Sequence, residues 1–176
     1  MKSLILCFSL LFAIPAWADL TPTQRTTLRT DILADPVLSV LQPSSNAIYQ
    51  IIDVYKAAPT VACTVWRSSV PADEYREAIT WTAVDGLTTG KARIWDWVTA
   101  SMTLPINASK TNIRRGIADA WGATSATGVA LASLSKRSAN RLEKLFATGA
   151  CTTASPSIMA IEGELSYSDV LQVMGW

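Results

Sequence analysis

The 176-residue sequence predicts a mainly α-helical, single-domain fold with a minor two-stranded β element. Three observations support this prediction. Several segments place apolar residues three and four positions apart, which is the spacing of one buried helix face. Capping Ser and Thr residues and prolines mark where these segments begin and end. Two short β-like runs remain between the helical segments, and they suit strands better than helices.

Residues 1–18 have the pattern of a secretory leader. Lys2 supplies the positive charge, Leu4 to Ile14 form an apolar stretch, and Ala16-Trp17-Ala18 fits the small-x-small cleavage rule. The apolar stretch is shorter than the roughly 20 residues of a membrane-spanning helix. We therefore expect a leader, no stable membrane insertion after its removal, and one helical domain over 19–176.

The predicted helices follow one another along that domain. The first begins at the capping Thr21 with Pro22 in its first turn and ends at Asp35-Pro36, and the second spans 45–56. A short last helix opens at Ser166. Between them we expect four helical stretches, at 71–81, 89–102, 107–121 and 127–148. In the fourth, one apolar face carries Leu131, Leu134, Leu142 and Leu145.

The two β-like runs, 61–66 and 158–165, are expected to pair with each other. Such pairing would bring Cys63 near Cys151, the two cysteines that follow the leader. An even pair in an exported protein is compatible with one disulfide. Two separate thiols are the alternative, and from the sequence alone we weigh them slightly above the bridge.

Composition excludes several classes of active site. The chain has no histidine, so Ser-His-Asp triads, Cys-His pairs and histidine-ligated zinc are absent. Its formal net charge of +1 argues against direct readout of nucleic acid. No phosphate loop, dinucleotide fingerprint or metal-spaced cysteine set is present. We predict no enzymatic activity and no cofactor. A hydrolase without histidine would depend on Glu162 and Glu164, which share one side of the predicted strand, although a solvated strand face is the preferred interpretation.

Two groups of side chains are candidates for contact with other proteins. Basic residues are in excess between 107 and 151, and Arg137, Arg141 and Lys144 align on the predicted helix, as they also would on an ordinary solvent face. Such a face would meet an anionic partner or another copy of the chain.

The tryptophans form the second group. We expect Trp97 and Trp121 to be buried on apolar stripes. Trp95 points away from Trp97, and Trp176 ends the chain, so these two are the candidate interface aromatics.

Four segments resemble a family of small proteins encoded in tailed-phage and prophage genomes. The likeness runs from about Asp19 to Val173. It rests on Leu28-Arg29-Thr30-Asp31-Ile32-Leu33-Ala34-Asp35-Pro36, Thr64-Val65-Trp66-Arg67-Ser68-Ser69-Val70, Glu143-Lys144-Leu145-Phe146-Ala147-Thr148-Gly149 and Glu162-Gly163-Glu164-Leu165-Ser166.

The resemblance implies a non-enzymatic virion component or assembly protein that acts through contacts with virion subunits or with itself. Members of the family begin near Leu20, so residues 1–18 are either an added export signal or an upstream extension of the gene. Without the leader, the protein belongs to the virion or to the host cytoplasm during assembly. With it, the alternative function is an exported periplasmic or secreted binding module or inhibitor with one disulfide.

Overall fold

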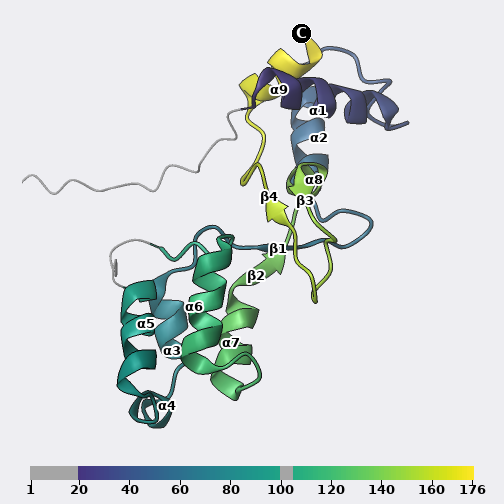
Figure 1. Ribbon diagram of the computed structural model, residues 1–176. Helices are drawn as coiled ribbons and strands as arrows, with labels where there is room; N and C mark the ends of the chain where they lie inside the picture. The colour runs from purple at the N-terminus through teal and green to yellow at the C-terminus, as the bar shows by residue number, and fades with distance from the viewer. Residues whose placement is uncertain (1–19, 100–104) are drawn as a thin grey trace, which may run out of the picture.

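The computed structural model describes residues 20–99 and 105–176, and it is mainly α-helical with two small antiparallel sheets (Figure 1). The predicted leader at 1–18 and the end of the predicted helix at 89–102 lie outside the described residues. In chain order, the elements are α1 (Pro22–Ala34), α2 (Ser45–Lys56), β1 (Thr64–Trp66), α3 (Ala72–Glu77), α4 (Trp81–Asp85), α5 (Thr89–Thr99), α6 (Thr111–Trp121), α7 (Ala126–Leu134), β2 (Lys136–Ser138), α8 (Arg141–Leu145), β3 (Ala147–Thr148), β4 (Ile158–Met159) and α9 (Tyr167–Met174).

Helices α1, α2 and α9 begin at the predicted residues. Thr21 and Gln24 form a capping box at the start of α1, and Pro22 occupies the first turn. Ser44 caps α2, and Ser166 forms a second capping box with Asp169. These caps bind backbone N–H groups that have no partner within the helix, which is why short local patterns fix the helix starts.

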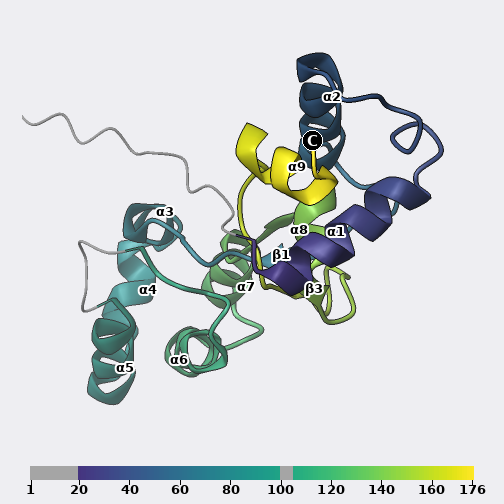
Figure 2. The same ribbon diagram turned by 90° about the horizontal axis from the view of Figure 1, so that it is seen from above.

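Apolar side chains gather into two large, separate cores. The first lies among α1, α2, α8 and α9, which we call the terminal lobe (residues 20–56 and 140–176). The second lies among α3 to α7, which we call the inserted lobe (residues 70–99 and 105–134). Figures 1 and 2 show the two lobes at opposite ends of the molecule. The inserted lobe thus lies within the sequence of the terminal lobe, because the chain leaves the terminal lobe after α2 and returns to it at α8.

A short antiparallel ladder, which we call the stem, joins the lobes. Its register pairs Val65 of β1 with Arg137 of β2. On its other side, β1 lies beside Ser157 through an isolated parallel bridge, and the backbone N–H of Trp66 donates to the Ser157 carbonyl. Strands β3 and β4 pair with each other in a second small sheet. The prediction that 61–66 pairs with 158–165 is therefore wrong, because the main partner of β1 is β2, at 136–138.

The predicted helix over 127–148 is also wrong. It is divided into α7, β2, α8 and β3. Asn140 starts α8 through a capping box with Glu143, and this local polar pattern interrupts the apolar periodicity. The four leucines of the predicted stripe consequently separate, because Leu131 and Leu134 enter the inserted core and Leu142 and Leu145 enter the terminal core. The stretch at 71–81 is likewise broken, with α3 ending at Glu77 and α4 starting at Trp81.

Candidate functional site

The two cysteines meet where the stem joins the β3–β4 segment. Cys63 and Cys151 form a disulfide across 88 residues of chain. Cys63 is buried and packs with Val65 and Ala139 in a third, small apolar cluster. The separate thiols that we weighed slightly higher from the sequence are not what the structure contains. The bridge closes a loop that includes the whole inserted lobe.

A charged cluster lies next to this apolar cluster, because Arg137 is paired with Val65 in the stem and also contacts the sulfur of Met159, which packs against the apolar cluster. The Arg137 guanidinium donates to both carboxylate oxygens of Glu143 at 2.7 Å and to Glu162 Oε1 at 3.0 Å. The hydroxyl of Ser68 donates to the other oxygen of Glu162. Only 3% of the Glu143 side chain is exposed. This cluster joins the stem to α8 and to the segment that follows β4.

The cluster lowers the pKa of Glu143 and raises the pKa of Arg137. Burial alone would raise the pKa of Glu143, but hydrogen bonds from Arg137 and from the backbone N–H groups of Asn140 and Gly163 hold it below its ordinary value. The pKa of Arg137 is raised, chiefly by its hydrogen bonds to Glu143 and in spite of burial. Both groups are therefore held in their charged forms.

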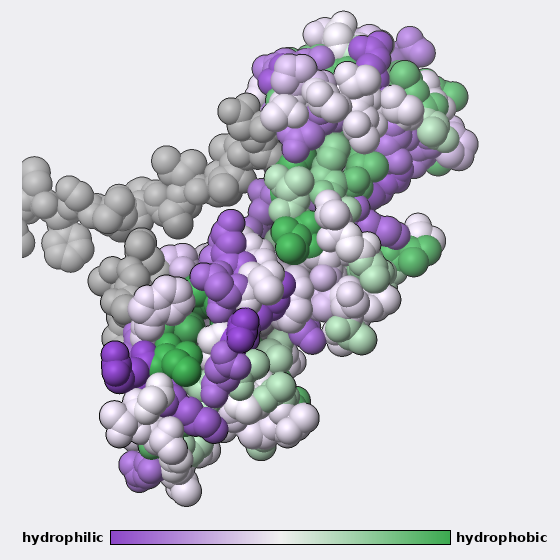
Figure 3. Space-filling view, in the orientation of Figure 1, coloured by the Kyte–Doolittle hydropathy of each residue, from purple (hydrophilic) through white to green (hydrophobic). Residues whose placement is uncertain are grey.

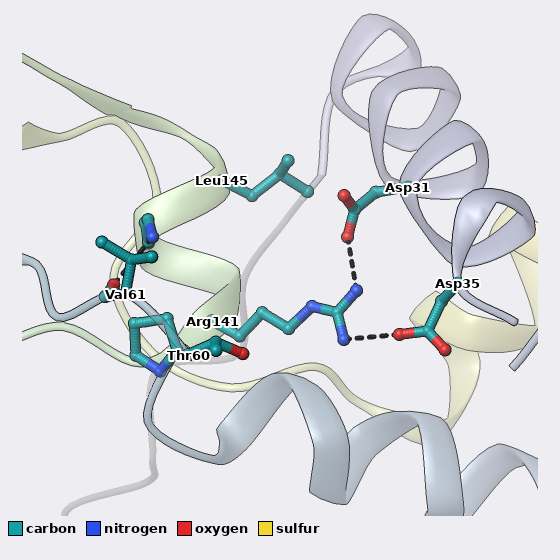
Figure 4. A pocket seen from close by; sticks show the side chains of 8 residues that line it. Asp31, Asp35, Thr60, Val61, Arg141 and Leu145 are labelled. Carbon is teal, nitrogen blue, oxygen red and sulfur yellow. Dashed lines mark hydrogen bonds and ion pairs between the residues drawn. The ribbon is translucent and has the colours of Figure 1, made fainter. Parts of the chain in front are cut away.

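A second cluster lines a groove of about 570 Å³ between the terminal lobe and residues 59–61 (Figure 4). Arg141 reaches from α8 to Asp35 Oδ2 at 2.8 Å and Asp31 Oδ2 at 3.1 Å. Its guanidinium carbon lies 4.7 Å from the ring centroid of Tyr55, whose hydroxyl donates to Asp31. The hydrogen bond from Arg141 lowers the pKa of Asp35, and burial followed by the Asp31 contact raises the pKa of Tyr55. The groove is built around these contacts between α1, α2 and α8.

The structure does not align the three basic candidates on one helix. Arg137 lies on β2, whereas Arg141 and Lys144 lie on α8, so the alignment inferred from a continuous helix is wrong. The two arginines bind carboxylates within the chain, and Lys144 donates to the Val61 carbonyl at 2.7 Å. A helical wheel could not reveal this because the pairing partners lie elsewhere in the sequence.

Glu162 and Glu164 do not form a carboxylate pair on a strand. Strand β4 ends at Met159, before either residue. Glu162 binds Arg137 and Ser68, whereas Glu164 pairs with Lys56 of α2 at 3.0 Å. The arrangement does not place the two carboxylates together as the predicted strand would.

The tryptophans of α5 exchange the positions that we expected. Trp97 is 64% exposed, and the expectation that it is buried is wrong. Trp95 is half-buried in the inserted core, where its ring packs on Tyr75 and, edge to face, on Trp121. Residue spacing places Val98 on one apolar stripe with Ile94 and Trp97 and on a second stripe with Trp95, so spacing could not decide which stripe faces the core. Trp121 is buried as expected.

The C-terminal residue of the chain is partly buried. Trp176, the second candidate interface aromatic, packs against the edge of the terminal core. Its backbone N–H donates to the Leu171 carbonyl of α9. The chain end is therefore bound to the last helix.

Exposed tryptophan surface lies instead on the outer helices of the inserted lobe. Trp81 of α4 is 83% exposed. On α5, Gly90, Arg93, Ile94 and Trp97 line a shallow hollow of about 350 Å³, which we call the α5 surface. The spacing of these residues is helical, but their exposure could not be predicted without the phase of α5. Hydrophobic residues are visible at the boundary of α5 and α6 and again near β4 (Figure 3).

Two kinds of feature are absent from residues 20–99 and 105–176. No group of His, Cys, Asp and Glu side chains there could hold a metal ion, and no helix there has the length and apolar character needed to cross a membrane. Comparisons of the chain with protein-family models, with curated proteins and with solved structures found no match.

Proposed function

We propose that the protein is a non-enzymatic interaction protein of a tailed phage or prophage, and that it serves in the virion or its assembly through protein contacts. The observation that carries the proposal is the α5 surface. Trp97 and Ile94 project from the outermost helix of the inserted lobe, where Trp97 leaves most of its ring in water. Tryptophan is the residue type most enriched among the side chains that dominate protein interfaces.

The charged side chains support the same proposal. The acids and bases that could have served catalysis are held in ion pairs that join the stem to the terminal lobe and its segments to one another. Such pairs orient two parts of a fold with respect to each other, and they leave their groups in fixed charge states. The resemblance to phage-encoded proteins supplies the class of partner, namely virion subunits.

The test begins with particles purified from the native host. Mass spectrometry of purified virions should detect the chain, and its absence would contradict a role as a virion component. Trp97→Ser should then lower the number of copies per particle by a factor of about ten or more. The reason is that a tryptophan at the centre of an interface contributes about 2 kcal/mol or more to the binding free energy. Val40→Ser is the matched control, since Val40 is an exposed apolar residue of the terminal lobe. Equal incorporation of both variants would exclude the α5 surface as the contact.

Two observations favour a second function, that of an exported periplasmic or secreted binding module. The disulfide Cys63–Cys151 suits an oxidising compartment, and residues 1–18 have the pattern of a leader. Fractionation of the native host, followed by N-terminal sequencing, separates the two proposals. A periplasmic chain that begins at Asp19 supports export. A cytoplasmic chain that begins near Leu20 and has two titratable thiols excludes it.

A further inference from the structure

The feature that carries a further inference is the surroundings of Trp66, the last residue of β1. The guanidinium carbon of Arg114 lies 4.5 Å from the Trp66 ring centroid, and Lys136 Nζ lies 5.2 Å from it. Arg114 comes from α6 and Lys136 from β2, so three elements meet here. The indole and the two cations form one surface at the base of the stem.

These two cations differ from the arginines of the ionic clusters because neither has a carboxylate partner among the described residues. Arg114 donates to the carbonyls of Ala108 and Ser109 and to the Thr111 hydroxyl. Lys136 donates to the Thr153 carbonyl at 3.1 Å. All of these acceptors are neutral. Partial burial lowers the pKa of Arg114, with no neighbouring carboxylate to oppose it. The surface therefore carries two positive charges that the described part of the chain does not neutralise.

An apolar hollow of about 130 Å³ opens beside Trp66. Its walls are Ile117 and Ala118 of α6, Ala123, and Gly128 and Ala132 of α7, with Arg114 at its side. For comparison, an apolar cavity of about 150 Å³ accepts benzene. Because the hollow is slightly smaller than that cavity, it has room for a single aliphatic side chain.

A wider polar shelf adjoins this hollow and shares Ala123 and Ala132 with it. The shelf measures about 500 Å³, and it is lined by Thr64, Lys136, Ser138 and Thr153. Its hydroxyl groups and the Lys136 ammonium suit the backbone and acidic side chains of a bound segment. The apolar hollow and the wider polar, cationic shelf thus lie side by side.

We propose that this surface is a second binding site, distinct from the α5 surface, that takes an acidic peptide segment of a partner protein by inserting one of its aliphatic side chains beside Trp66. The aliphatic group fills the hollow, and the flanking carboxylates pair with Arg114 and Lys136. A nucleic-acid base is disfavoured because the cations already lie against the indole and because the hollow suits an aliphatic group better than a purine.

The test titrates three pentapeptides into the isotope-labelled full chain and follows the indole N–H signal of Trp66 by NMR. The acidic probe is acetyl-Asp-Glu-Leu-Asp-Glu-amide, and we expect it to bind. Serine in place of its leucine should weaken binding about tenfold or more, because the apolar side chain that fills the hollow is then missing. The lysine analogue, acetyl-Lys-Lys-Leu-Lys-Lys-amide, should not bind.

Matched variants locate the site. Ala132→Phe fills the hollow and should weaken binding of the acidic probe at least about tenfold, whereas Ala126→Phe, on an exposed position of the same helix, should not. Lys136→Gln should weaken binding about threefold, and Lys91→Gln on α5 should leave it unchanged. Trp97→Ser should also leave it unchanged, so that this proposal and the α5 surface fail separately.

Several outcomes would overturn the assignment. Absence of binding at millimolar acidic probe is one, and equal binding of the lysine analogue is another. Indifference of the affinity to both Ala132→Phe and Lys136→Gln would place any bound peptide elsewhere. Displacement of the acidic probe by oligothymidine would identify a nucleic-acid site. A dimer that Lys136→Gln dissociates would identify a second copy of the chain as the occupant.

Discussion

Different kinds of contact stabilise the terminal lobe and the inserted lobe. In the terminal lobe, polar contacts join residues far apart in sequence, as Arg141 joins Asp31 and Asp35, and as Arg29 donates to the carbonyls of Val173 and Met174. In the inserted lobe, the ion pair from Arg115 to Asp119 spans one turn of a single helix, and the long-range side-chain contacts of Tyr75 with Ser135 and of Arg67 with the Leu134 carbonyl lie where the lobe meets the stem. Within the inserted lobe, helices pack closely through small residues. A Cβ atom at Gly116 of α6 would lie 2.8 Å from a Val98 methyl carbon of α5.

This difference indicates how the two lobes divide the work of the chain. Long-range polar contacts orient the segments of the terminal lobe and connect it to the stem. The inserted lobe is one continuous stretch of short helices that depends on apolar packing, and it presents Trp81 and Trp97 to solvent. The stem lies between them, with its ionic cluster on the terminal side.

The largest expected effect comes from breaking that cluster. Arg137→Met leaves the Glu143 carboxylate buried without its main partner, and it should lower the free energy of unfolding by about 4 kcal/mol. Lys136→Met is the matched control on the same strand, and its cost should stay below about 1 kcal/mol. Urea denaturation measures both. Equal costs would show that the cluster adds no more than an exposed charge does.

Core truncations test whether the lobes unfold separately. Leu28→Ala in the terminal core and Leu131→Ala in the inserted core each empty a fully buried position and should each cost about 3 kcal/mol. Hydrogen exchange should show faster exchange over α5–α7 for Leu131→Ala and over α1, α2 and α9 for Leu28→Ala. Faster exchange throughout the chain in both variants would mean that the stem couples the lobes into one cooperative unit.

The pH dependence of stability gives a smaller effect on the terminal side. The pKa of Glu143 lies below its ordinary value of 4.5 in the folded chain, so its ionisation stabilises the fold above that value. This contribution is lost as the pH falls through the folded pKa. Between about pH 5 and about pH 3, the wild-type chain should lose more stability than Glu143→Gln, which cannot titrate there. Thermal unfolding of both proteins across this range measures the difference, and parallel profiles would contradict the assignment.

The contrast between the lobes also explains what the sequence could predict. Helices α1, α2 and α9 were predictable because their caps lie within three residues of the groups that they bind. The division of 127–148 was not, because Leu131 and Leu142 look alike in sequence but enter different cores. Arg137 and Arg141 looked like surface cations because the carboxylates that bind them belong to other elements. The α5 surface was missed because Val98 belongs to two apolar stripes of α5, one with Trp97 and one with Trp95.

The smallest expected effect on stability belongs to Trp97, and the comparison with Trp95 makes it informative. Trp97→Ser removes an exposed ring and should change the free energy of unfolding by less than about 0.5 kcal/mol. Trp95→Ser, two residues away, removes contacts with Tyr75 and Trp121 and should cost about 3 kcal/mol. Urea denaturation of the two variants side by side fixes the phase of α5 in solution. If the larger cost falls on Trp97, then the helix turns its other stripe to the core, and Trp95 becomes the aromatic residue that a partner would meet.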